Sequence, residues 1–338
     1  MRTSFKVLMG LSSLLLTGAA VADPVLVPVT PFPNASTTSV FGIADDNNTI
    51  AGSYVDQDGI SHGFYGTLDG NYTSFDYPDG PDTQARAIDG GGMIITGFSN
   101  IAGAHCELVP WEYGLEKGKI KRVSRDGVGI NGIVQGINKV GAFAGDYCDG
   151  EGVVHGSTDK NYRVKRDVDT GISSSYTGER AFNGFGTSAG FYVNDNTGLQ
   201  IGTLVDKDGN VTTITYPDAN ESYTVFEGLN DHNRSDGQWG DTSGIVHSFE
   251  YNTKTGNFTE IDDPFAASFT QAWGMNSSGL IAVTSDAGPY IYCPKENSCP
   301  LNTAHAIRLN ARVVHGEPGA TRNHAPSKHV LPKGAARQ

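Results

Sequence analysis

Six side chains that recur 45 to 49 residues apart are of the types that bind and transform acidic ligands. They are Phe41, Arg86, Gln135, Arg180, Glu227 and Trp273. Arginine guanidinium groups bind carboxylates through paired hydrogen bonds, and a glutamate beside them can donate or accept a proton. The two aromatic residues provide flat faces on which a sugar or another planar ligand can stack. The residue types and the spacing predict a site to which each of six repeats contributes one side chain.

Two interpretations of these positions stay open at this stage. In the functional one, four of the positions bind substrate and the other two join a histidine in catalysis. The substrate-binding residues are then Arg86, Gln135, Trp273 and Phe41, and the catalytic residues are Glu227, Arg180 and His247. In the structural one, the arginines and the glutamate form ion pairs that fill a water-containing channel. Structural ion pairs use the same residue types as active sites do.

Each of the six positions belongs to a repeated phrase. It is followed by glycine or alanine, then by an apolar residue, and usually by asparagine or aspartate, as in Glu227-Gly228-Leu229-Asn230. The glycine or alanine stands at positions 42, 87, 136, 181, 228 and 274. A period of this length is typical of a repeat array.

The first repeat, residues 40–80, predicts four short strands joined by tight turns. The strands are expected at 40–43, 50–54, 62–65 and 72–78, and the segments between them are rich in Asp, Asn and Gly. These residues favour turns because their side chains bond the local backbone or permit unusual backbone angles. Four strands in about 46 residues are typical of one blade of a β-propeller.

The N-terminal segment supplies a strand that the last repeat lacks. Residues 25–33 resemble the fourth strand of a blade, because the sequence Val-Thr-Pro-Phe-Pro-Asn-Ala at 29–35 resembles Ile-Thr-Tyr-Pro-Asp-Ala at 214–219. We therefore predict an all-β fold over residues 23–307, a six-bladed β-propeller of four-stranded antiparallel blades closed by the N-terminal strand. Pairing the two ends of the array removes open sheet edges. The first strand of each blade would line the central channel and direct the six side chains toward one another.

Four histidines stand near the start of the third strand of their repeats: His62, His105, His155 and His247. Equivalent positions on separate blades are too far apart to bind one metal ion at about 2 Å. We therefore predict no metal site and expect each histidine to bond its own Asp-rich turn. A histidine whose strand end reaches the channel is still a candidate general base, which is why His247 is in the catalytic set.

Two turns, at 56–59 and 206–209, resemble fragments of calcium-binding loops. Neither is followed by the glutamate that an EF-hand requires, so turn chemistry explains them better. A calcium ion in the channel stays open but has no support in the sequence. We predict no cofactor.

The two ends of the chain differ from the repeats. Residues 1–22 combine Arg2 and Lys6 with an apolar run and a small-residue cleavage site, which predicts a signal peptide and a secreted or periplasmic protein. No other apolar run is long enough to predict a transmembrane segment. Residues 308–338 are basic and poor in apolar residues, so we expect a disordered tail.

Charge and cysteine content restrict the partners and the compartment. A net charge of -13 argues against nucleic acid, which requires a basic face, and suits a neutral or cationic partner as well as simple solubility. In an oxidising compartment the four cysteines are expected to pair. We expect Cys293 to pair with Cys299 across a short loop and Cys106 with Cys148 between neighbouring repeats. We expect a monomer.

The repeat resembles the bacterial extracellular HAF repeat, which combines a Gly-Ile-Asn phrase, a Gly-x-Tyr strand, a His-Gly-Phe strand and an Asp-Tyr-Pro ending. The first repeat matches it best, through Gly42-Ile43, Gly52-Ser53-Tyr54, His62-Gly63-Phe64 and Asp76-Tyr77-Pro78. The resemblance spans roughly residues 25–300 and implies a secreted, propeller-like protein. It does not imply one activity, because a fold hosts many functions.

The leading functional hypothesis is an enzyme that acts on an extracellular, acidic carbohydrate. In a polysaccharide lyase, Arg86 and Arg180 would neutralise a uronate carboxylate while Glu227 or His247 removes the neighbouring proton, which leads to β-elimination. The alternative is a non-catalytic propeller module that binds a glycan or a protein. A hydrolase is a third option, weakened because no second carboxylate is predicted at the level of Glu227.

Overall fold

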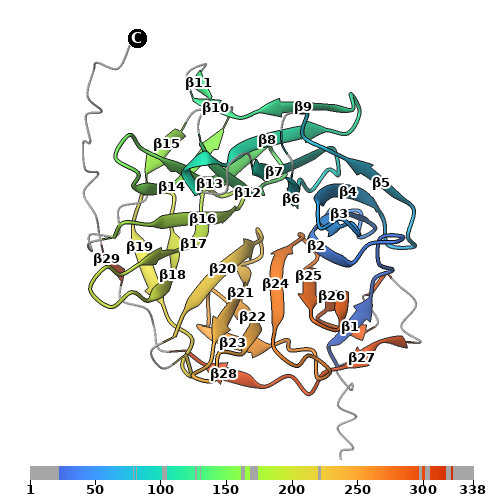
Figure 1. Ribbon diagram of the computed structural model, residues 1–338. Coiled ribbons are helices and arrows are strands. Elements are labelled where there is room, and N and C mark those ends of the chain that lie inside the picture. Colours follow the sequence, from blue (N-terminus) through green and yellow to red (C-terminus); the bar gives the residue numbers. More distant parts are fainter. Residues whose placement is uncertain are drawn as a thin grey trace, which may run out of the picture.

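Six antiparallel sheets surround a central channel in the computed structural model, which confirms the predicted six-bladed β-propeller (Figure 1). The structure describes residues 23–78, 80, 82–100, 105–125, 128–129, 131–160, 164–167, 174–219, 222–296, 299–300, 305–316 and 321–322. The predicted signal peptide, residues 1–22, lies outside this part of the chain. No helix within it is long and apolar enough to cross a membrane.

The first five blades follow the chain, each with its four strands in sequence order from the channel outward. Blade one contains β2 (Thr37–Ile43), β3 (Thr49–Val55), β4 (Ser61–Thr67) and β5 (Tyr72–Phe75). Blade two contains β6 (Asp82–Ile88), β7 (Ile94–Asn100), β8 (Val109–Gly114) and β9 (Lys119–Arg122), with the short helix η1 (His105–Glu107) before β8. Blade three contains β12 (Gly132–Ile137), β13 (Ala142–Cys148), β14 (Val154–Lys160) and β15 (Val164–Asp167). Blade four contains β16 (Thr177–Phe182), β17 (Ser188–Val193), β18 (Gln200–Val205) and β19 (Val211–Ile214). Blade five contains β20 (Thr224–Leu229), β21 (Arg234–Gly240), β22 (Val246–Asn252) and β23 (Asn257–Glu260). The hairpin of β10 (Ser124–Arg125) and β11 (Val128–Gly129) connects blades two and three.

Blade six joins the two ends of the array, as the sequence predicts. Its strands are β24 (Thr270–Met275), β25 (Ile281–Ser285), β26 (Gly288–Cys293) and the N-terminal strand β1 (Val25–Pro28). β1 pairs with β26 in antiparallel register, with Val25 opposite Cys293 and Pro28 opposite Tyr290. Apolar residues of β1 and of blade one share one buried cluster, so closure of the ring also builds core.

Every first strand carries a β-bulge at the position predicted to face the channel. In β2, Val40 pairs with Gly52 and Gly42 pairs with Ala51, so Phe41 between them has no partner. In the other five first strands the same shift in register leaves one residue without a partner on the second strand. These residues are Arg86, Gln135, Arg180, Glu227 and Trp273. A bulge redirects the side chain of its extra residue and frees it from the sheet. This explains why the position varies in type while its neighbours repeat.

The small residue after each bulge is required by close packing of the first strands. A Cβ atom on Gly136 would lie 2.2 Å from the carbonyl oxygen of Arg180 in the next blade. A Cβ atom on Gly274 would lie 2.9 Å from the carbonyl oxygen of Phe41, across the closure of the ring. These contacts explain why glycine stands at positions 136 and 274.

The asparagine that ends the phrase in blades three to six connects its blade to the next. The side-chain oxygen of Asn138 accepts hydrogen bonds from the amides of Val140 and Ala142, which fixes its own turn. Its Nδ2 donates to the carbonyl oxygen of Asn183 in the next blade at 3.2 Å. Equivalent bonds run from Asn183 to Asn230, from Asn230 to Asn276 and from Asn276 to Ala44. The last of them ties blade six to blade one.

Two disulfides confirm the predicted pairing. Cys106 in η1 bonds to Cys148 at the end of β13 and so joins blades two and three. Cys293 bonds to Cys299 and closes a short loop after β26. The described part of the chain contains no free cysteine.

The segment after residue 307 differs from the disordered tail expected from its composition. β27 (Ile307–Arg308), β28 (Val313–His315) and β29 (Thr321–Arg322) add a fifth antiparallel strand to blades six, five and four in turn. We call these three strands and the chain around them the strap. Ion pairs from Arg308 to Glu296 and from Arg312 to Asp218, both at 2.9 Å, bind it to the blades. The outer edge of a blade offers unpaired backbone groups to which a further strand can hydrogen-bond. The amino-acid composition of the segment does not indicate this pairing. Residues 323–338 lie outside the described residues.

Candidate functional site

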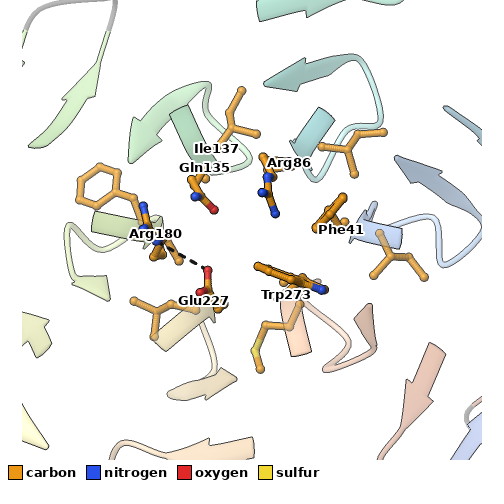
Figure 2. A pocket seen from close by; sticks show the side chains of 18 residues that line it. Phe41, Arg86, Gln135, Ile137, Arg180, Glu227 and Trp273 are labelled. Atoms are coloured by element: carbon orange, nitrogen blue, oxygen red, sulfur yellow. Dashed lines mark ion pairs between the residues drawn. The ribbon is translucent and has the colours of Figure 1, made fainter. Parts of the chain in front are cut away.

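The six bulge residues meet around one cavity in the central channel, as Figure 2 shows. The cavity is lined by Phe41, Arg86, Gln135, Arg180, Glu227, Trp273 and the two residues that follow each of them. Its volume is about 50 Å³, which is more than a single water molecule needs. In this structure the cavity therefore admits a carboxylate on a short stem but not a whole sugar ring.

The Arg86 guanidinium lies beside the two aromatic rings of the site. Its Cζ is 4.3 Å from the centre of the Phe41 ring and 5.0 Å from that of Trp273. Its Nη2 donates to Oε1 of Gln84 at 2.8 Å, whereas its buried Nε and Nη1 have no hydrogen-bond partner in the described chain. Burial lowers the pKa of Arg86 to about 10, although the charge of Glu227 opposes the shift. The group is still a cation at neutral pH, with unused donors.

The charge of the other channel arginine, Arg180, is already paired. Its Nη1 lies 3.2 Å from Oδ2 of Asp146, and its Nε lies 3.8 Å from Oε2 of Glu227. Burial alone would lower the pKa of Arg180, but Tyr176, Glu227 and Asp146 together raise it. Its guanidinium also stacks on the Phe191 ring at 4.9 Å. This arginine organises the wall of the cavity and is less available to a ligand than Arg86.

Glu227 lies opposite Arg86 in the ring and is only 9% exposed. Burial raises its pKa to about 7, because the loss of hydration outweighs the attraction of Arg180 and Arg86. Near neutral pH the group is therefore divided between its acid and its carboxylate forms. It can donate or accept a proton there, as general acids and bases do.

A second buried carboxyl group, Asp236, lies directly behind the channel wall, and the sequence interpretation missed it. It is fully buried, and neither of its oxygens has a hydrogen-bond partner among the residues that the structure describes. A Cβ atom on Gly228 would lie 2.0 Å from its Oδ2. Burial, reinforced by the charges of Glu227 and Glu250, raises the pKa of Asp236 well above its usual value.

Comparison of the blades would have revealed Asp236 in the sequence. It pairs with the residue after the bulge, and the other five blades place small uncharged residues there. Those residues are Ala51, Thr96, Ala144, Ala189 and Ala282. Blade five therefore differs from the others, because it has a carboxyl group where four of them have the methyl group of alanine.

The histidines lie on the blades, away from the ring, and serve the turns. His62 contacts Asp56 at 3.1 Å and Asp76 at 2.8 Å, and its ring stacks on Tyr54. His155 contacts Asp149 at 3.0 Å in the equivalent turn. The expected bond to the Asp-rich turn is present in both blades. The fourth histidine, His105, lies in η1 rather than at the start of a strand.

The structure does not bring His247 together with the other candidate catalytic residues. Its Nδ1 lies 2.6 Å from Asp262, its Nε2 lies 3.6 Å from Asp241, and its ring stacks on Trp239 at 4.4 Å. It does not line the channel cavity. Both ring nitrogens face carboxylates of its own blade, as those of His62 do.

In the two turns that resemble calcium-binding loops, the first aspartate accepts hydrogen bonds from backbone amides of its own turn. Oδ1 of Asp56 accepts the amides of Asp58 and Ile60, each at 2.9 Å. Oδ1 of Asp206 accepts the amides of Asp208 and Asn210 in the same way. Within the described residues, no three His, Cys, Asp or Glu side chains are grouped to hold a metal ion.

Solved structures similar to this chain are propellers and show a likeness of fold alone. TolB from Acinetobacter baumannii aligns with 75% of this chain and 65% of its own, at 14% identity and a TM-score of 0.52. This chain thus spans less than two thirds of that structure. AofleA from Arthrobotrys oligospora aligns over 87% and 92%, at 9% identity and a TM-score of 0.49. Aleuria aurantia lectin in complex with alpha-methyl-L-fucoside aligns over 86% and 97%, at 10% identity and a TM-score of 0.47.

The sequence itself matches no protein-family model and no curated protein.

Proposed function

We propose that this protein is a secreted or periplasmic binding propeller that takes one carboxylate of an acidic extracellular ligand, such as a uronate-containing glycan, into its channel. The observation that carries the proposal is the half-buried Arg86, whose Nε and Nη1 atoms are buried and have no hydrogen-bond partner in the described chain. Unpaired buried donors on a cation are costly, and a ligand carboxylate would satisfy them with charge-assisted hydrogen bonds.

The groups around Arg86 suit an incoming anion. Glu227, with its pKa raised to about 7 by burial, is largely uncharged in mildly acidic solution and does not repel a second carboxylate there. Arg180 stays paired with Asp146, so it holds the wall in place without competing with Arg86 for the ligand. Phe41 and Trp273 pack against the guanidinium.

The size of the cavity favours an acidic glycan that enters only through its carboxylate. The carboxylate of a uronate projects from the sugar ring by a single bond, so that group can enter while the ring stays outside. A net charge of -13 repels an anion at long range, so binding would rely on local contacts with Arg86. We therefore expect selectivity for carboxylates with modest affinity.

The compartment is supported by three independent features. The sequence begins with a predicted signal peptide, both disulfides suit an oxidising environment, and the repeat resembles the extracellular HAF repeat.

One observation favours the enzymatic form, a polysaccharide lyase, as a second candidate. The pKa of Glu227 is raised to about 7, which is the range expected of a base that removes a proton at neutral pH. Glu227 would take the proton next to the uronate carboxylate, and the electron pair left behind would form the new double bond as the glycosidic oxygen departs. This reaction needs the channel to widen enough to admit the sugar ring.

A panel of oligo-uronates and matched neutral oligosaccharides tests both candidates. We expect calorimetry to detect binding of the uronates alone and Arg86→Gln to reduce that affinity at least tenfold. Arg308→Gln, on the strap, is the matched control and should change nothing. Absorbance of unsaturated ends follows elimination in the same samples. Equal binding of neutral and acidic sugars, or no binding of either, would refute the proposed function.

A further inference from the structure

The channel has a second mouth, separated from the Arg86 cavity by a ring of apolar side chains. The ring consists of Ile43, Ile88, Ile137, Phe182, Leu229 and Met275, and it lines the cavities on both of its sides. The second cavity extends from this ring to the turns that connect the first and second strands of the blades. The two mouths can therefore bind different ligands.

The turns around the second mouth divide into an apolar half and a polar half. On blades two, three and four they expose Met93, Val140 and Phe185, which are 47%, 57% and 68% exposed. These are three of the seven large apolar side chains that are exposed in the described chain. The position two residues after the end of the repeated phrase is Val140 in blade three and Phe185 in blade four. In blades one, five and six the same position is occupied by Asp46, His232 and Ser278.

Lys139 spans the mouth between the two halves. It belongs to blade three, and its Nζ pairs with Oδ2 of Asp231 in blade five, past the turn of blade four. The hydrogen bond that Lys139 donates to Asp231, together with the charges of Asp231 and Asp45, raises the pKa of Lys139. Gly90 leaves room for this arrangement, since a Cβ atom there would lie 2.6 Å from Oδ2 of Asp45 and 3.2 Å from the Cβ of Lys139.

We propose that this mouth binds an extended segment of a partner protein that presents a lysine or arginine next to an apolar residue. Asp45 and Asp231 would hold the cation, and Met93, Val140 and Phe185 would cover its apolar neighbour. In the free protein Lys139, which is 52% exposed at its side chain, occupies the place of the incoming cation. A partner would displace it.

Charge complementarity selects this occupant over an acidic glycan. The mouth is lined by Asp45 and Asp231 with a single lysine, Lys139, Asp46 is exposed in the turn of blade one, and the whole chain is acidic. A cationic segment is attracted by such a surface, and like charges across an interface are strongly disfavoured. Exposed apolar side chains gathered at one site are typical of protein-binding surfaces. The proposal is thus independent of the carboxylate site at Arg86.

Fluorescence anisotropy with three labelled peptides tests the proposal. The peptides are Gly-Phe-X-Leu-Gly-Gly, in which X is lysine, norleucine or glutamate. We expect the lysine peptide to bind at least tenfold more tightly than the glutamate peptide and to weaken as salt is added, because salt screens the charge contribution. Lys139→Ala should strengthen binding severalfold by removing the internal competitor, and Asp231→Asn should abolish the preference for lysine.

Phe185→Ser should weaken binding at least fivefold. Phe265→Ser is its matched control, because Phe265 is equally exposed, at 72%, in the connection between blades five and six. The proposal is wrong if the three peptides bind alike, if none of them binds, or if the two phenylalanine variants behave in the same way. Sedimentation of the unliganded protein gives a further check. Dimerisation that Phe185→Ser abolishes would identify a second copy as the occupant and overturn the proposal.

Discussion

The Arg86 guanidinium of blade two lies over the Phe41 ring of blade one, with its Cζ 4.3 Å from the ring centre. Both residues are the unpaired members of β-bulges, so neither is held by the sheet ladder at this point. Phe41 also contacts Trp273 of blade six edge to face at 4.9 Å. The contact therefore joins three blades at the centre of the ring and holds the cation in the cavity.

Phe41→Leu tests how much the contact of Phe41 with Arg86 and Trp273 contributes to the free energy of unfolding. The variant keeps an apolar side chain but loses the cation–π contact and the contact with Trp273, each worth about 1 kcal/mol. We expect the free energy of unfolding in urea to fall by about 1–3 kcal/mol. Phe185→Leu, at an exposed turn, should change it by less than about 0.5 kcal/mol. Equal effects of the two substitutions would contradict the account.

Asp236→Ala should stabilise the protein, because alanine is the residue that most blades carry at this position. The substitution removes a buried carboxyl without a hydrogen-bond partner, for which we expect a gain of about 1–3 kcal/mol. The pKa of Asp236 is raised on folding, so its destabilising effect is absent below the unfolded pKa and grows as pH increases above about 4. Urea titrations at pH 4, 6 and 8 should show a widening gain over the natural protein. A variant less stable than the natural protein at every pH would show that Asp236 has a partner.

Ligand affinity should fall as pH rises through about 7, the pKa to which burial raises the Glu227 carboxyl. Above that pH Glu227 is charged and repels the ligand carboxylate. We expect the affinity for an oligo-uronate to decrease roughly tenfold, or about 1.4 kcal/mol, between pH 5.5 and 8.5. The affinity of Glu227→Gln should be nearly constant over this range, as calorimetry can measure. A natural protein whose affinity does not vary with pH would exclude Glu227 from the site.

Asn276→Ala tests the closure of the ring. The side-chain oxygen of Asn276 accepts the amides of Ser278 and Leu280, and its Nδ2 donates to the carbonyl oxygen of Ala44 at 2.9 Å. The loss of these buried bonds should lower the free energy of unfolding by about 2–3 kcal/mol. Asn196→Ala, in an exposed turn, serves as the control with a change below about 0.5 kcal/mol. Similar losses in both variants would show that the link between the blades adds little.

The sequence predicts the architecture well because each blade repeats the same local chemistry. The small residue at position 136 and the asparagine at position 138 recur because neighbouring first strands touch at these points. The missing strand was found at residues 25–33, and the structure places it at Val25–Pro28. The six channel residues were also found from the sequence, because the position before the small residue is the bulge.

The sequence did not predict features that break the repeat or depend on long-range packing. Asp236 lies at a position that is otherwise small, but its burial depends on blade six, which packs against Gly228. The strap from β27 to β29 is held by the edges of three blades, and its own composition resembles that of an unstructured tail. His247 was placed in the catalytic set from its register in the strand. Its distance from the channel depends on how far out the third strand lies in a blade.

A crystal structure of the protein with a tri-uronate tests the central claim most directly. The account predicts one carboxylate of the ligand in the channel, with its oxygens within about 3 Å of Nε or Nη1 of Arg86, and the sugar rings outside the Arg86 cavity, on the side away from the apolar ring. A ligand bound elsewhere on the blades, with only water beside Arg86, would contradict it.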